Sequence, residues 1–110
     1  MSREQIIAQT ILEQLGGNRF IVMTGAKNFL RDDRDGLVSL SFNIGRNSSR
    51  ANKVKITLET SDTYTVRFSR FSRKGMSYED KELLLVTDVY ADTLREVFTD
   101  FTGLYTSLRG

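Results

Sequence analysis

The first apolar residues of the chain recur with the period of a helix. They lie three or four positions apart and therefore form one stripe along a helix surface: Ile7, Ala8, Ile11, Leu12 and Leu15. Ser2 and Gln5 have the spacing of a capping box. Gly16-Gly17 follows the stripe, where glycine readily takes the left-handed conformation that ends helices. We expect a helix that begins at Arg3 and stops at these glycines.

In the middle of the chain, apolar and polar residues alternate. The ranges 38–44, 53–59 and 64–69 each place apolar side chains on one face of a strand and polar side chains on the other. Strands with one buried and one solvated face are typical of an antiparallel sheet. Ser61-Asp62 lies where a hairpin turn is expected between the second and third of these strands.

Two apolar runs of four residues are too short to show a period. Phe20–Met23 is rich in strand formers, and we expect it to be a strand buried on both faces. Leu83–Val86 is the candidate for a further, shorter strand. The polar stretches 24–36 and 72–81 are expected to be loops.

Helical spacing returns towards the end of the chain. Asp88 is expected to cap a second helix and Gly103 to end it. The core-facing stripe of this helix contains Tyr90, Leu94, Val97, Phe98 and Phe101. The apolar tail, residues 104–108, is expected to pack back onto the domain.

The order of these elements predicts an α+β fold in which residues 1–110 form a single domain. An antiparallel sheet of four or five strands is flanked by an N-terminal and a C-terminal helix. Both helices bury their stripes most economically by covering the apolar face of the sheet.

Composition narrows the chemistry that the chain can perform. Among its 110 residues there is no Cys and no His, which excludes disulfides, thiolate metal sites, Cys nucleophiles and conventional catalytic triads. No signal-peptide pattern and no apolar stretch of membrane-spanning length is found, so we expect a cytoplasmic protein without membrane association. We also expect no cofactor, no metal and no enzymatic activity.

Two acidic patterns resemble metal sites without having the complete ligand set. The run Arg31–Gly36 has part of a calcium-loop spacing, but Arg31 and Phe42 stand at its first and last ligand positions, which excludes an EF-hand. We interpret this run as a solvated turn. Asp62 together with Glu79-Asp80-Lys81 contains the acid-x-Lys pattern of metal-dependent nucleases, but the second part falls in an expected loop.

Charge is segregated along the chain, although the formal net charge is only +2. Between Arg46 and Lys74, eight Lys and Arg residues stand against two Asp and Glu residues. Strand parity places Lys53, Lys55 and Arg67 on the solvated face, where the last two would repel each other across a hairpin. Such a surface is typical of phosphate binding, whereas the alternative is that these charges only solvate an open sheet. The candidate nucleic-acid-binding residues are Arg46, Arg50, Lys53, Lys55, Arg67, Arg70, Phe71, Arg73 and Lys74.

The segment 67–73 interleaves aromatic and basic residues, as single-strand binders do where bases stack on rings. Parity places Phe68 in the core and Phe71 on the opposite side, unless a bulge carries it inward. Phe71 is therefore the candidate stacking residue, with packing in the core or at the sheet edge as the alternative.

Acidic residues follow the spacing of one helix face. Like charges four residues apart destabilise a helix slightly, so helix stability does not explain them. They form either a solvated face or a protein-binding surface that occupies a partner's basic groove. The candidate protein-binding residues are Asp88, Asp92, Glu96 and Asp100.

Distinctive motifs occur near both ends of the chain: LGGNRF at 15–20, MTGAKNF at 23–29 and TGLYTSL at 102–108. With the segments 54–58 and 90–92, they resemble a group of small uncharacterised proteins that bacteriophages, prophages and other mobile elements encode. The resemblance implies a phage-like origin and a single small domain, and it carries no activity and no functional residues.

The sequence therefore predicts a non-enzymatic accessory protein that binds nucleic acid through a basic sheet face. The alternative is a protein-interaction module or an inhibitor of a host factor, for example a defence or replication component, that acts through the acidic helix.

Overall fold

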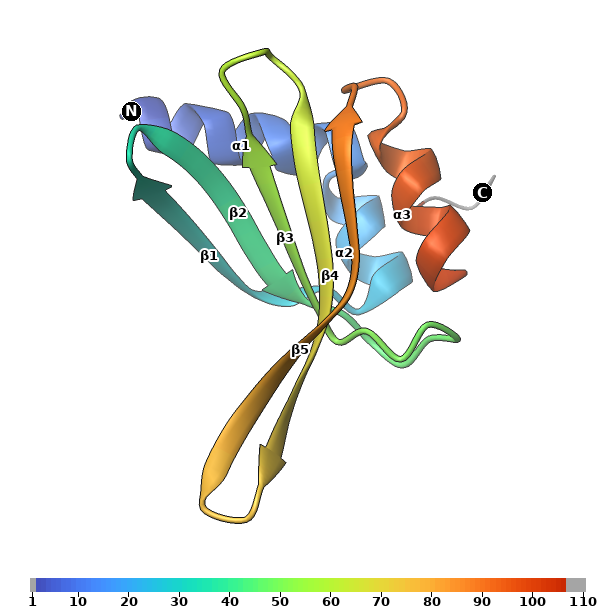
Figure 1. Cartoon of the computed structure of the whole chain (residues 1–110). Helices are drawn as coiled ribbons and strands as arrows, with labels where there is room; N and C mark the ends of the chain where they lie inside the picture. The colour runs from blue at the N-terminus through green and yellow to red at the C-terminus, as the bar shows by residue number, and fades with distance from the viewer. Residues whose placement is uncertain (1, 107–110) are drawn as a thin grey trace.

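Five antiparallel strands form one sheet in the order β1-β2-β3-β4-β5, so that each strand pairs with its neighbour in sequence. A computed structural model describes residues 2–106 of the chain, and three helices lie against one face of the sheet (Figure 1). This arrangement confirms the predicted α+β class with helices at both ends. The elements are α1 (Arg3–Leu15), α2 (Asn18–Thr24), β1 (Lys27–Arg34), β2 (Leu37–Asn43), β3 (Lys53–Leu58), β4 (Tyr64–Lys74), β5 (Ser77–Val89) and α3 (Leu94–Thr102).

Helix α1 begins and ends as its sequence predicts. The Gln5 backbone N–H donates to the Ser2 hydroxyl at 3.2 Å, and the Ser2 N–H donates to the Gln5 side chain at 3.0 Å. Gly16 ends the helix with a φ of 129°. Ala8, Ile11 and Leu15 are buried, so the predicted stripe faces the core.

The prediction of a strand over Phe20–Met23 is wrong, because these residues lie in α2. A run of four apolar residues fits a buried strand or one turn of a buried helix equally well. Helical spacing buries Phe20 and Thr24, four residues apart, and leaves Val22 81% exposed. The Thr24 hydroxyl donates to the Phe20 carbonyl at 2.7 Å, and Gly25 ends the helix in the left-handed conformation.

The prediction of a loop over 24–36 is wrong. This stretch contains the last residue of α2, its C-cap Gly25 and the whole of β1. Strand β1 is an edge strand that pairs only with β2, and most of its side chains are exposed. Because β1 has no buried face, apolar and polar residues do not alternate along its sequence. Asp35 and Gly36 both have positive φ, 55° and 80°, as the two central residues of a tight hairpin turn require.

The stretch 72–81 is also not a loop. It forms the far end of the hairpin of β4 and β5, which turns at Gly75 and projects beyond the rest of the sheet (Figure 1). We call residues 70–81 the distal hairpin. Because no helix covers it, both of its faces meet solvent and its sequence shows no buried face. Leu83–Val86 belongs to β5, as expected for a further strand.

The second predicted helix exists but begins later than predicted. Asp88 lies in β5 with a φ of 56°, and α3 begins at Leu94 after Thr93. Of the predicted stripe, Leu94 and Phe98 are buried, whereas Tyr90 is 60% exposed because it precedes the helix. Gly103 ends α3, as predicted, with a φ of 76°.

The described part of the tail does pack back. Leu104 packs against the core and Thr106 is buried, whereas residues 107 and 108 lie outside the described residues.

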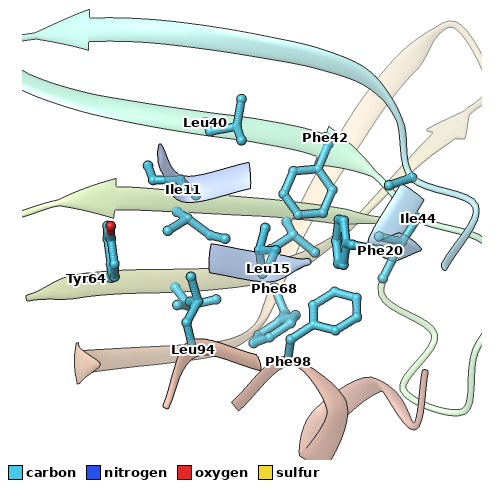
Figure 2. Close-up of a cluster of buried hydrophobic side chains, with 14 of the residues drawn as sticks. Ile11, Leu15, Phe20, Leu40, Phe42, Ile44, Tyr64, Phe68, Leu94 and Phe98 are labelled. Carbon is cyan, nitrogen blue, oxygen red and sulfur yellow. The ribbon is translucent and has the colours of Figure 1, made fainter. Parts of the chain in front are cut away.

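Aromatic rings join the helices to the sheet. Phe20 of α2 meets Phe42 of β2 edge to face at a centroid distance of 5.4 Å, and Phe98 of α3 at 5.2 Å (Figure 2). Ile11 and Leu15 of α1 complete this cluster from the same side. Solvent reaches the opposite face of the sheet only in part, since Ser39 and Ser69 are buried on it. Among residues 2–106, no helix has the length and apolar character needed to cross a membrane.

Candidate nucleic-acid interface

The sheet distributes the predicted cations over two faces. Register pairs Lys55 directly with Arg67, and Lys53 with Ser69, while their neighbours Val54 and Phe68 face the core. Lys53, Lys55 and Arg67 lie on the outer face, opposite the helices, as strand parity predicts, but all three are only partly exposed. Along β4, the alternation continues without a break, so Arg73 shares the outer face, whereas Arg70 and Lys74 point to the helix side.

Carboxylates of β5 neutralise one of these cations. Arg67 Nε lies 3.0 Å from Glu82 Oε1, and its Nη1 lies 3.1 Å from Asp80 Oδ2. The expected repulsion between Lys55 and Arg67 is therefore relieved within the molecule. The sequence did not indicate these ion pairs because one partner, Asp80, lies in the stretch 72–81 that was expected to be a loop.

A second cation is paired at the far end of the distal hairpin. Lys74 Nζ lies 3.2 Å from Glu79 Oε2, and both side chains are well exposed. An exposed pair of this kind contributes about 0–1 kcal/mol and is weakened by salt. Arg67 and Lys74 are thus the two candidate residues with the least charge left for a ligand.

The remaining arginines on the helix side gather around one hollow. Arg46, Arg50 and Arg70 line a depression of about 710 Å³ together with Asn47 and Asn52. We call this site the arginine hollow. Its lining contains no carboxylate, and none of the three arginines forms an ion pair within residues 2–106.

The loop between β2 and β3 holds two of these arginines in place. The Asn47 amide donates to the carbonyls of Gly45 at 2.8 Å and Ala51 at 2.7 Å, and its oxygen accepts from the Ser49 N–H at 3.1 Å. These bonds close the loop on itself between Arg46 and Arg50. Asparagine suits this position because its short amide bonds to nearby backbone groups.

Arg70 joins the loop to β4. Its Nη1 donates to the Arg50 carbonyl at 2.8 Å, so part of the guanidinium is fixed while the rest faces the hollow. In Figure 1, the loop emerges beside the point where β4 and β5 leave the rest of the sheet. The hollow therefore lies at the base of the distal hairpin.

Two aromatic rings stack on the outer face of the same hairpin. Phe71 and Tyr78 are nearly parallel, with an interplanar angle of 14° and a centroid distance of 5.3 Å. Their exposed fractions are 43% and 65%. Lys53 Nζ lies 5.8 Å from the Phe71 centroid. We call Phe71 and Tyr78 the aromatic pair.

The backbone beneath the aromatic pair is anchored by one side chain. The Asn52 amide donates to the Phe71 carbonyl and its oxygen accepts from the Phe71 N–H, both at 2.8 Å. Phe71 is exposed on the outer face, as parity predicts, and packs against Tyr78; its role in base stacking stays a prediction. Tyr78 was missed in the sequence because only the register of β5 brings it next to Phe71.

The predicted acidic ridge on one helix face is wrong. Only Glu96 and Asp100 lie in α3, whereas Asp88 lies in β5 and Asp92 lies in the turn that precedes the helix. All four side chains are exposed. Without a shared helix, the four-residue spacing does not place them in one row.

The two halves of the nuclease-like pattern are far apart. Asp62 lies in the turn before β4, with a φ of 63°, whereas Glu79 pairs with Ser72 near the other end of that strand. Within the described part of the chain, no three His, Cys, Asp or Glu side chains are close enough to hold a metal ion.

Comparison of this chain with protein-family models, with curated proteins and with solved structures finds no match. Function is therefore inferred from the arginine hollow and its surroundings.

Proposed function

We propose that this protein is a non-enzymatic accessory protein that binds nucleic acid by holding phosphates in the arginine hollow. The observation that carries the proposal is the convergence of Arg46, Arg50 and Arg70 on one depression whose lining has no carboxylate. Three guanidinium groups repel one another unless anions neutralise them, and phosphates are, with carboxylates, the anions that their planar donors fit.

The other predicted cations have smaller roles in this proposal. Lys53, Lys55 and Arg73 lie outside the hollow on the outer face, where they add to the attraction of a polyanion at longer range. Arg67 and Lys74 are already paired with acids of β5 and contribute least.

The resemblance to phage-encoded proteins supports an origin in a mobile element. We accordingly propose that the protein acts in the cytoplasm, which is the host's cytoplasm if a phage encodes it. The alternative, binding of a host protein through acidic residues, stays a prediction, and the structure removes the continuous ridge on which it depended.

Binding of labelled oligonucleotides, followed by fluorescence anisotropy at low salt, tests the proposal. We expect the wild-type protein to bind, and the double variant Arg46→Gln with Arg50→Gln to bind about tenfold more weakly, because two charge-assisted contacts are lost. Arg34→Gln removes one arginine charge from β1, at the turn end of the β1–β2 hairpin, and serves as the control for loss of an arginine outside the hollow.

Failure to bind both single-stranded and duplex probes at low salt would contradict the proposal. Equal affinities of the double variant and the control would show that phosphates are held elsewhere.

A further inference from the structure

The aromatic pair presents apolar rings to solvent beside the proposed phosphate site. An exposed fraction of 65% leaves most of Tyr78 in contact with water, and Phe71 lies between this ring and Lys53. Within residues 2–106, Tyr78 stays mostly exposed, whereas Phe71 is exposed over less than half of its surface. An exposed aromatic ring next to cations is the kind of surface on which unpaired bases stack in single-strand binders.

Adjacent residues of β4 serve the two sites from opposite faces. Arg70 lines the hollow on the helix side, and Phe71 carries its ring on the outer face. A single ligand that reaches both sites must therefore pass around an edge of this strand.

The edge of β4 is accessible at that point. Strand β3 begins at Lys53, which pairs with Ser69, and Asn52 extends the pairing only as far as Phe71. Beyond Phe71, β4 is paired on one side only, by β5. A ligand can turn around the strand here, between the arginine hollow and the aromatic pair.

Such a turn discriminates between nucleic acids by stiffness. Duplex DNA has a persistence length of about 150 base pairs and does not fold around one strand of a sheet. A single strand rotates freely about its backbone bonds and exposes unpaired bases.

From these observations we infer that the ligand is single-stranded nucleic acid, with phosphates in the arginine hollow and a base stacked on the aromatic pair. This inference rests on the proposed function and names its substrate class. The shared chemistry is an unpaired base on a phosphodiester chain, which single-stranded DNA and RNA both supply.

The test separates the contribution of bases from that of phosphates. Fluorescence anisotropy is measured with oligothymidine, with an abasic strand of the same length and with the corresponding duplex. We expect oligothymidine to bind about five- to a hundredfold more tightly than the abasic strand, the range that stacking of one base produces. Oligouridine forms the RNA arm, and a preference for either polymer over the abasic strand supports the inference.

The double variant Phe71→Thr with Tyr78→Thr removes the rings while keeping residues that favour strands. We expect it to bind oligothymidine and the abasic strand with equal affinity, and to bind the abasic strand as the wild type does. Tyr90→Thr removes an exposed tyrosine outside the distal hairpin and is the matched control, with the base preference retained.

Tyrosine emission gives a second readout, since the chain contains no Trp. Stacking of a base on Tyr78 is expected to quench the emission of the wild type, and Tyr78→Thr is expected to lose that quenching.

Three results would overturn the inference while leaving the proposed function standing. These are equal binding of oligothymidine and the abasic strand, tighter binding of the duplex than of oligothymidine, and a base preference that persists in the double variant. Absence of binding to every probe at low salt would instead remove the proposed function and this inference together.

Discussion

Two asparagines organise the candidate site at the scale of single residues. Asn47 closes the loop that carries Arg46 and Arg50, and Asn52 holds the backbone of Phe71. Neither carries charge, yet each fixes one of the two surfaces that the proposals use. Sequence reasoning from charge and aromaticity did not identify either asparagine, because Asn47 acts through bonds to the backbone of its own loop and Asn52 through bonds to the backbone of β4.

Tyr64 makes the stability of the protein depend on pH. Burial raises the pKa of its hydroxyl above 10.0, the hydrogen bond to Gln14 opposes this rise, and the charge of Asp62 adds to it. The folded chain therefore holds this proton more tightly than the unfolded chain. The resulting stability is fully present below pH 10.0 and is lost as the pH rises through the raised pKa.

We expect the difference in unfolding free energy between wild type and Tyr64→Phe to be constant below about pH 9 and to shrink above about pH 10, by up to about 1.4 kcal/mol per pH unit. Urea unfolding of both proteins at a series of pH values measures this difference in unfolding free energy. A difference that stays constant across this range would show that the hydroxyl ionises equally in both states.

At the scale of elements, α2 is the part of the fold that the sequence misassigned most clearly. Val22 lies on its exposed side. We expect Val22→Ala to raise the free energy of unfolding by about 0.5 kcal/mol, and Val22→Gly to lower it by a few tenths of a kcal/mol, as helix propensities require. Chemical denaturation of the three proteins measures both changes. A loss of stability in both variants would favour a strand, in which Ala and Gly are both unfavourable.

The sequence predicted those elements that have one buried and one solvated face. Helix α1 and the strands over 38–44, 53–59 and 64–69 show this contrast, and the structure confirms them. Strand β1 and the distal hairpin are exposed on both faces, so they carry no hydrophobic period to detect. The Asp35-Gly36 turn agrees with the prediction of a solvated turn in Arg31–Gly36, but that prediction did not extend to a hairpin.

The candidate site was predictable only in part, because some of its residues meet through the register between strands. Arg46, Arg50 and Arg70 were among the expected cations, and parity placed Phe71 on the correct face. The partners of Arg67 and the position of Tyr78 depend on the register of β5 against β4, which includes two irregularities. A pattern along one strand does not fix its register against another.

At the scale of the whole molecule, the sheet separates charge that the sequence places together. The predicted single basic face becomes a hollow of three arginines on the helix side and a partly neutralised outer face with the aromatic pair. The distal hairpin projects from this junction (Figure 1). A polymer with alternating charged and flat groups matches this division better than a compact anion does.

The salt dependence of oligothymidine binding tests the central claim most directly, because counterion release reports the number of neutralised phosphates. Each contact to a single strand contributes about 0.7 to the slope of log affinity against log salt concentration. We expect the variant with Arg46→Gln and Arg50→Gln to have a slope shallower than the wild type by about 1.4, and Arg34→Gln to match the wild type. Identical slopes for all three proteins would contradict the assignment of phosphates to the arginine hollow.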